Sequence, residues 1–298
     1  MPSREEEPAV VTQFIRKVRG ASQAILARGS DEKLYVVKFR NDRQGPNLLF
    51  NECMGTELYL QAGLPVPSWR LMVLTSQFAD RNPACWIETP SGRVRPEPGL
   101  CFGSRFLGGQ DIRLFEILPG NSFRRVRNRT DFWRAWFIDV CAGHADNRQA
   151  IFQQDKQGHM DAEFIDHGHM FCSPNGDLRP SFLASRYYLD PRIYPNVCSG
   201  TEVGLRRTAT TLDFNALWAR VLSLPDEWIT RSGLRNFAEC LETLSNPRLI
   251  ERVIEAITGS QTAPYEFPRD ELTCGRQPGS SFLRPGIPSG GDRHLTCA

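Results

Sequence analysis

The chain has 298 residues, of which 40% are hydrophobic and 23% are charged, and its formal net charge is +2. This length supports one large domain or two modest ones, and the composition excludes a small disulfide-stapled scaffold, wholesale disorder and a collagen-like repeat. The small net charge gives no reason to expect a nucleic-acid or membrane partner. One basic cluster is typical of a solvated loop, and it consists of Arg124, Arg125, Arg127 and Arg129.

The thiols and the N-terminus indicate where the protein resides. Nine cysteines are scattered along the chain without a CxxC pair, which favours reduced thiols over a disulfide framework or a structural zinc site. The N-terminus has no apolar signal segment, and no run of 18 apolar residues occurs. The sequence therefore predicts a cytoplasmic protein.

The first third of the chain is predicted to be rich in β-structure. Residues 1–9 form a charged leader, and residues 10–107 form an N-terminal unit. Alternating apolar runs at 10–18, 21–28 and 33–40 predict three antiparallel strands. Residues 47–62 change to a helical period and end before Gly63-Leu64-Pro65. Further strands are expected at 69–75 and 100–106, separated by a loop at 88–99.

The remainder, residues 108–260, is predicted to be mainly helical. It begins with the helical pattern of residues 131–143, for which Asp131 is a plausible N-cap. Residues 149–154 and 162–166 predict a hairpin, and helices are expected near 212–223, 233–244 and 247–258. Residues 261–298 are rich in proline and glycine and predict a disordered tail.

Lysine is scarce, because the 36 basic residues comprise 32 arginines and only four lysines. One of these, Lys38, lies in the predicted strand LYVVKFR, on a face that also carries an apolar side chain. A charge there should be paired or bound to a ligand, although a snorkelling strand lysine would satisfy the same pattern. Glu52 lies mid-helix on the side expected to pack on the sheet. A strand lysine opposite a helix glutamate is the ion pair with which kinases hold nucleotide phosphates.

A turn of small residues precedes this strand. Its members Gly20, Ala21, Ser22 and Gln23 join the first two predicted strands. Gly20 tolerates positive φ, and the small neighbours allow backbone N–H groups to approach an anion. Because a hairpin turn with a glycine is common, the turn gains meaning only from the lysine and glutamate that follow it.

Two carboxylates are expected to converge across the predicted hairpin. Asp146, in AGHADNRQAIF, precedes its first strand, and Asp166, in AEFIDHGHMF, ends its second. One can orient or deprotonate an attacking hydroxyl, while the other can bind Mg²⁺, which prefers oxygen ligands. Asn147 and Gln149 offer neutral oxygens for a second metal position. Alternatively, Asp146 and Asn147 merely form a polar turn.

In this order, the motifs resemble the HipA-like kinases, a compact bacterial branch of the atypical protein-kinase-like superfamily. The resemblance rests on RGASQAIL, YVVKFRNDRQG, NECMGTELYLQAGLPVP, GHADNRQAIF and FIDHGHMF, and it spans roughly residues 10–250. It implies an α+β, two-lobed fold: a small antiparallel β-sheet lobe with one helix, and a larger mainly helical lobe. It also implies ATP- and Mg²⁺-dependent phosphoryl transfer to a hydroxyl acceptor, a protein Ser/Thr or a small molecule.

The resemblance assigns a role to each matching residue. Lys38 would contact the nucleotide phosphates beneath the turn at 20–23, and Glu52 would position Lys38. Asp146 would be the catalytic aspartate, and Asp166 would bind Mg²⁺. The kinase pattern places a metal-binding Asn five residues after the catalytic Asp, but this chain has Ile151 there. Asn147 and Gln149 are therefore the candidate substitutes.

Two other functions use the same residues. A metal-dependent hydrolase could draw its ligands from a histidine- and aspartate-rich segment, whose members are His144, Asp146, Asp166, His167 and His169. That interpretation gives Lys38 and Glu52 no role. A catalytically inactive nucleotide-binding pseudokinase would keep the lysine and the turn but lose efficient transfer, as the isoleucine at position 151 suggests.

Overall fold

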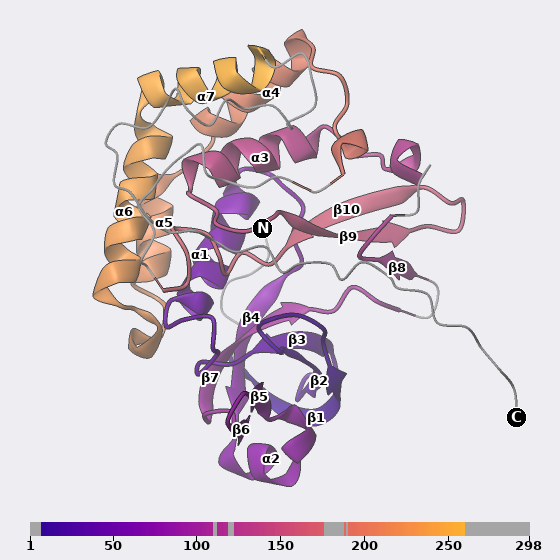
Figure 1. The fold of residues 1–298 in the computed structure, drawn as a ribbon, viewed down its shortest axis with the longest axis vertical. Helices are drawn as coiled ribbons and strands as arrows, with labels where there is room; N and C mark the ends of the chain where they lie inside the picture. Colours follow the sequence, from indigo (N-terminus) through magenta and orange to yellow (C-terminus); the bar gives the residue numbers. More distant parts are fainter. Residues whose placement is uncertain (1–6, 110–111, 119–121, 176–187, 189, 260–298) are drawn as a thin grey trace, which may run out of the picture. The chain divides into compact units, whose positions relative to one another are not determined.

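The computed structural model describes residues 7–109, 112–118, 122–175, 188 and 190–259 (Figure 1). The predicted tail at 261–298 and most of the predicted leader lie outside these residues. None of the helices in the described ranges combines the length and apolarity that a membrane crossing requires.

Five strands near the N-terminus close into a barrel in the order β1-β2-β3-β7-β4. They are β1 (Ala9–Lys17), β2 (Ile25–Gly29), β3 (Leu34–Lys38), β4 (Trp69–Leu74) and β7 (Gly99–Arg105). The first three form the predicted antiparallel meander. The barrel closes because β1 also pairs in parallel with β4, with Ala9 opposite Met72. Apolar side chains such as Val37 and Phe39 fill its interior.

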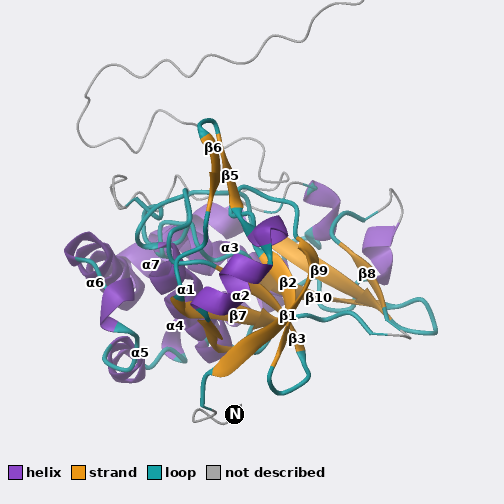
Figure 2. Cartoon of the chain, turned by 90° about the horizontal axis from the view of Figure 1, so that it is seen from below, coloured by secondary structure: helices purple, strands orange, loops and turns teal. Residues whose placement is uncertain are grey.

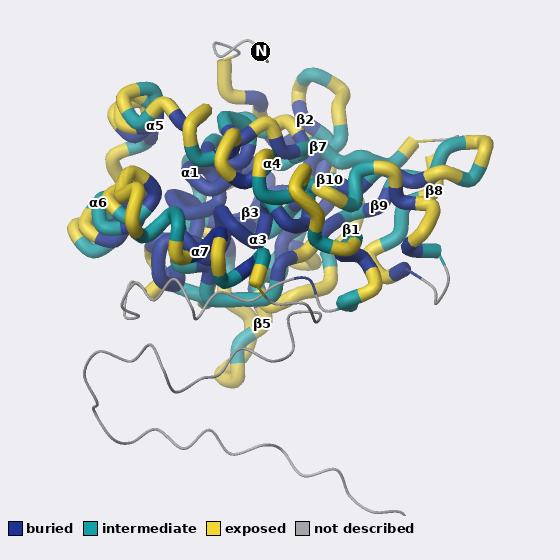
Figure 3. Tube along the Cα trace, turned by 90° about the horizontal axis from the view of Figure 1, so that it is seen from above, coloured by how far each residue is buried: buried dark blue, intermediate teal, exposed yellow. Residues whose placement is uncertain are grey.

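Helix α1 (Leu48–Gln61) matches the predicted helix almost residue for residue. It contacts β7 on one side and α5 (Phe214–Val221) on another. Polar residues such as Asn51 and Glu52 are buried together with its apolar ones, and Figure 3 shows the helix mostly dark blue. A helix buried on several faces gives no clean amphipathic stripe, so its polar residues must find partners inside the protein.

The hairpin after α3 (Asp131–Cys141) lies where the sequence predicts it. It consists of β9 (Gln149–Gln154) and β10 (Met160–Ile165), and β8 (Arg113–Phe115) pairs with β9 to complete a three-stranded sheet. Helices α4 (Ser199–Thr210), α6 (Arg231–Ser245) and α7 (Pro247–Gly259) follow. The 3₁₀ turns are Pro83–Cys85, Ser122–Arg125, Pro191–Ile193 and Asp226–Trp228.

Several elements differ from the sequence prediction. The expected loop at 88–99 contains a projecting hairpin, β5 (Ile87–Thr89) and β6 (Gly92–Val94), and α2 (Ser76–Arg81) precedes it (Figure 2). The residues of β6 are all exposed, so apolar alternation could not reveal it. Helix α4 escaped prediction because Leu205 and Thr208 are the residues it buries, which is too few for a helical stripe.

Candidate nucleotide and metal site

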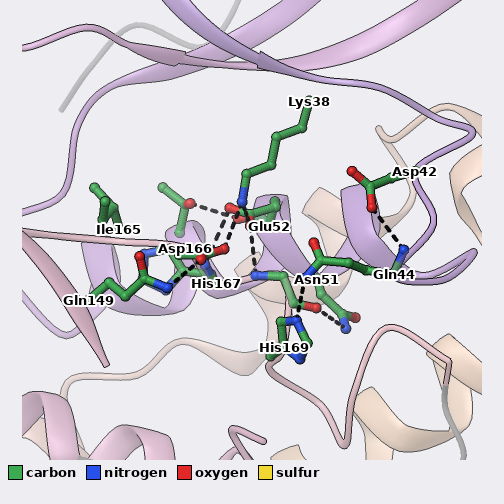
Figure 4. Close-up of polar contacts among 12 residues, drawn as sticks. Lys38, Asp42, Gln44, Asn51, Glu52, Gln149, Ile165, Asp166, His167 and His169 are labelled. Atoms are coloured by element: carbon green, nitrogen blue, oxygen red, sulfur yellow. Dashed lines mark hydrogen bonds and ion pairs between the residues drawn. The ribbon is translucent and has the colours of Figure 1, made fainter. Parts of the chain in front are cut away.

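Lys38 ends strand β3, and its side chain is only 10% exposed. Its Nζ donates to Glu52 Oε1 on α1 and, at 2.7 Å, to Asp166 Oδ1 just after β10 (Figure 4). The two partners lie 14 and 128 positions away in the sequence. An ammonium has three N–H donors, so two carboxylates leave one donor for a further anionic oxygen.

The ammonium of Lys38 dominates the electrostatics of this cluster. Burial alone would lower the pKa of Lys38, but Asp166 and Glu52 outweigh burial and raise it, so the ammonium stays charged. Burial also raises the pKa of Glu52, whereas the ammonium of Lys38 outweighs burial at Asp166 and lowers the pKa of that carboxyl. One ammonium thus faces two carboxyl groups, and their pKa values shift in opposite directions because the two groups also lie beside each other.

Main-chain N–H groups hold Glu52 in place. Gly168 N donates to its Oε1 at 2.8 Å, and His167 N donates to its Oε2 at 3.3 Å. A Cβ on Gly168 would lie 2.8 Å from Glu52 Oε1 and 2.4 Å from Leu48 Cδ1, so any other residue there would displace the Glu52 carboxylate or Leu48. The neighbouring Asn51 Nδ2 donates to the carbonyls of Gly168 and Met170 at 2.9 and 2.7 Å. These hydrogen bonds attach helix α1 to the segment that carries Asp166.

One imidazole ring joins the loops of the two predicted aspartates. His144 Nδ1 lies 2.5 Å from the carbonyl oxygen of Asp146, and its Nε2 lies 3.4 Å from that of Asp166. Burial and the charge of Arg148 lower the pKa of His144 to about 4, so the ring is neutral at pH 7. Asp166 has φ 62°, in the left-handed region, as is common where a functional side chain is aimed by its backbone.

The structure separates the two candidate substitutes for the missing asparagine. Gln149 Nε2 donates to Asp166 Oδ2 at 2.7 Å, so its amide lies against the carboxylate expected to bind metal. Asn147 contributes its backbone N–H to Asp146 Oδ1 at 2.7 Å. Ile151 lies within β9 opposite Glu163. The geometry therefore favours Gln149 over Asn147.

A buried ion pair that sequence patterns did not reveal lies at the base of the β9–β10 hairpin. Arg148 and Asp139 are 1% and 0% exposed and share a bidentate contact at 2.7 and 2.8 Å. Arg148 Nη1 also donates to the carbonyl of Ile165 at 2.8 Å, and Tyr59 OH donates to Asp139 Oδ1 at 2.7 Å. Bidentate arginine contacts of this kind fix the direction of both partners.

Among the described residues, the turn from Gly20 to Gln23 makes no direct polar contact with the Lys38–Glu52 pair. It joins β1 and β2, and Gly20 has φ 138° with open space around its missing Cβ. The side chain of Gln23 donates to the carbonyl of Glu88, 65 positions along the chain, at 2.8 Å. None of the hydrogen bonds or ion pairs between described residues connects Gly20, Ala21, Ser22 or Gln23 to Lys38, Glu52 or Asp166.

The residues required for a metallohydrolase do not form a ligand set. His167 is 2% exposed and packs on Tyr59 and Arg148, with its pKa well below the usual value because of burial. His169 instead contacts Gln44. Within the described part of the chain, no group of three or more His, Cys, Asp or Glu side chains is arranged to hold a metal ion.

Two further polar residues near Lys38 went unnoticed in the sequence. Asp42 and Gln44 lie in the loop between β3 and α1, inside the motif NDRQG. Asp42 is 8% exposed, and burial raises its pKa to about 6 despite the opposing charge of Lys38. The available signal was two polar residues, of a type that binds metals, immediately after the lysine strand.

Comparisons with known proteins bear on the fold. No protein-family model matches the chain, and no characterised sequence matches it. The crystal structure of the Helicobacter pylori proinflammatory kinase CtkA aligns with 86% of this chain and 100% of its own at a TM-score of 0.56 and 12% identity. The structure of Golgi casein kinase with Mn/ADP bound aligns with 86% of this chain and 74% of its own at a TM-score of 0.48 and 12% identity. A second structure of Golgi casein kinase aligns with 86% of this chain and 73% of its own at a TM-score of 0.48 and 11% identity. The likeness to CtkA shows that this chain has a kinase-like fold.

Proposed function

We propose that this protein is a HipA-like kinase that transfers the γ-phosphoryl group of ATP to a hydroxyl acceptor, a protein Ser/Thr or a small molecule. One observation carries the proposal: a buried lysine at the end of β3 contacts both a helix α1 glutamate and the aspartate after β10. Its two carboxylate partners leave one N–H of the ammonium available to a phosphate oxygen. The kinase-like fold supports this interpretation.

Each residue has a chemical role in the proposal. Lys38 uses its remaining N–H to contact a phosphate oxygen, and Glu52 keeps the ammonium aimed. Asp146 accepts or orients the acceptor hydroxyl proton while the oxygen attacks the γ-phosphorus, and the bond to the leaving ADP breaks. The backbone of Gly20, Ala21 and Ser22 is proposed to cover the phosphates.

The donor set fits a divalent cation such as Mg²⁺. Asp166 supplies a carboxylate, and the side chain of Gln149, whose Nε2 donates to Asp166 Oδ2 at 2.7 Å, would supply its amide oxygen. A bound cation would neutralise the charge on the β- and γ-phosphate oxygens during transfer. Without one, an anionic triphosphate would face the carboxylates of Asp166 and Asp146 with Lys38 as the opposing charge.

A second candidate is a nucleotide-binding protein that does not transfer phosphate. Ile151 favours it, because this position lies in strand β9 and offers no metal ligand. The two candidates share Lys38, Glu52 and Asp166 and differ only in turnover. A transfer assay with purified protein therefore separates them.

The first experiment measures the thermal midpoint with and without millimolar Mg-ATP. We expect the wild type to be stabilised by nucleotide and Lys38→Met to lose that shift, because the phosphate contact is removed. Lys33→Met is the matched control, since Lys33 is an exposed lysine in the turn before β3. An equal nucleotide shift in wild type and Lys38→Met would refute the assignment of Lys38.

The second experiment separates binding from transfer. Asp166→Asn should lose the part of the nucleotide stabilisation that depends on Mg²⁺. Asp146→Asn should keep that stabilisation and lose phosphate release or transfer from labelled ATP. If both variants lose nucleotide binding equally, the two aspartates do not have separate roles. If the wild type binds nucleotide but never transfers phosphate to itself or to added acceptors, the second candidate holds.

A further inference from the structure

Two oxygen atoms beside Lys38 lack the partners that buried oxygens normally have. Asp42 Oδ1 accepts from Gln44 N at 2.8 Å, but no partner among the described residues reaches Asp42 Oδ2. Gln44 Oε1 is also buried without a partner, while its Nε2 contacts His169 Nε2 at 2.8 Å. Buried polar atoms are nearly always paired, so two open acceptors in one loop indicate a ligand.

The loop is fixed in this open arrangement by its own anchors. Asn41 Nδ2 donates to the carbonyl of Arg95 at 3.0 Å, and its Oδ1 accepts from Glu97 N at 3.0 Å. At the other end, Asn47 N donates to the carbonyl of Pro174 at 2.9 Å. These anchors hold the backbone at both ends of the loop that carries Asp42 and Gln44. The two open oxygens thus lie on a loop whose ends are fixed to the rest of the fold.

The surroundings determine what kind of ligand fits. In Figure 4, Asp42 and Gln44 lie on one side of Lys38 and Gln149 lies on the other, and the open oxygen of Asp42 points toward the side where Lys38 lies. The charged and titratable groups facing the loop are Lys38, Asp166, Arg43 and His169. Lys38 already donates to Glu52 and Asp166, and Arg43 donates to the carbonyl of Glu88. A carboxylate and an amide oxygen that remain open suit a divalent cation.

We propose that Asp42 and Gln44 supply the protein ligands of a second divalent cation, bound together with the nucleotide. This inference rests on the proposed function, and it assigns the β3–α1 loop a role that position 151 cannot fill, because Ile151 lies in strand β9 opposite Glu163. The cation would be held between the open oxygens of the loop and phosphate oxygens of the nucleotide. An acceptor that brings its own ammonium group would suit the same oxygens and is distinguished by the test.

The test counts Mn²⁺ ions bound in the presence of a non-hydrolysable ATP analogue, by electron paramagnetic resonance and titration calorimetry. We expect two Mn²⁺ ions per nucleotide complex in the wild type. Asp42→Asn should weaken the second ion at least tenfold and leave the first unchanged, and Gln44→Leu should weaken it by a smaller factor. Glu97→Gln is the matched control, because it removes one exposed carboxylate beside the same loop and should change neither ion.

The outcomes separate this inference from the proposed function. Nucleotide binding with identical Mn²⁺ stoichiometry and affinity in wild type and Asp42→Asn would overturn the second cation site and leave the kinase proposal intact. Failure of the wild type to bind nucleotide would overturn both. Folding of Asp42→Asn is checked by its thermal midpoint without ligand, which should equal or exceed that of the wild type because an unpartnered carboxylate is removed. A lower midpoint would show that Asp42 has a structural partner and would refute the inference.

Discussion

Removing one member of the buried Arg148–Asp139 pair should destabilise the protein more than removing both. In Arg148→Met, Asp139 would keep Tyr59 OH as a donor but lose both guanidinium contacts while remaining 0% exposed. Breaking a buried pair from one side costs about 3–5 kcal/mol. The carbonyl of Ile165 would also lose its donor, which costs about 1 kcal/mol more.

The double variant Arg148→Met with Asp139→Leu removes the unpaired charge. Tyr59 OH can then donate to the carbonyl of Ala135, which lies 3.3 Å away. We therefore expect the double variant to recover at least about 2 kcal/mol relative to Arg148→Met, since apolar replacement of a buried pair is often neutral. Urea unfolding followed by tryptophan fluorescence measures both changes.

Two results would refute this reasoning. A loss below about 1 kcal/mol in Arg148→Met would mean that Asp139 is solvated or protonated without its partner. A double variant as unstable as the single one would mean that the cost is lost packing, not an uncompensated charge. If the reasoning holds, Arg148→Met should also weaken nucleotide binding, because Arg148 lies directly between Asn147 and Gln149 and fixes the end of β10.

Three other predictions follow from the site. Gln149→Leu should reduce Mg²⁺-dependent nucleotide stabilisation more than Asn147→Leu, and equal losses in a thermal-shift assay would contradict the preference for Gln149. Folding lowers the pKa of His144 to about 4, so the unfolded chain binds the proton at a higher pH than the folded protein does. The free energy of unfolding should therefore fall by up to roughly 3 kcal/mol as pH falls from about 6.5 to about 4. In urea titrations, His144→Gln should lack this part of the pH dependence. Gly55→Ala should destabilise the protein by about 1–3 kcal/mol, because the added Cβ would lie 2.5 Å from His167 Cβ. Gly204→Ala, where the added Cβ meets open space, should stabilise the protein by up to about 1 kcal/mol. The reverse order of stability in urea unfolding would contradict the packing argument.

Local patterns sufficed where burial and period coincide. The meander of β1, β2 and β3 and the β9–β10 hairpin appear nearly where the apolar periods place them, and helix α1 ends at Gln61, just before Gly63-Leu64-Pro65. Elements with little buried surface escaped, such as α4 and the exposed β5–β6 hairpin, because a solvated strand or helix needs no apolar stripe.

The residues of the site likewise include some that the sequence could identify and some that it could not. Lys38 stood out in the sequence because lysine is scarce and because its strand is apolar, and Glu52 stood out because it lies in a helix that follows directly. Sequence spacing could not choose between Asn147 and Gln149, since the choice depends on which side chain the turn aims at Asp166. Nor could it find the pairing of Arg148 with Asp139, because a salt bridge is an encounter of side chains and leaves no periodic trace.

By itself, the sequence determined the five barrel strands, the β9–β10 hairpin, helices α1, α3, α5, α6 and α7, and the order of the lysine, glutamate and two aspartates. Local periodicity and residue chemistry are properties of neighbouring positions. Only the tertiary structure decided that β1 closes the barrel against β4, that the carboxylates of Glu52 and Asp166 meet on Lys38, and that Asp42 and Gln44 keep open oxygens beside it. Those facts depend on contacts between residues up to 128 positions apart and on the burial that those contacts create.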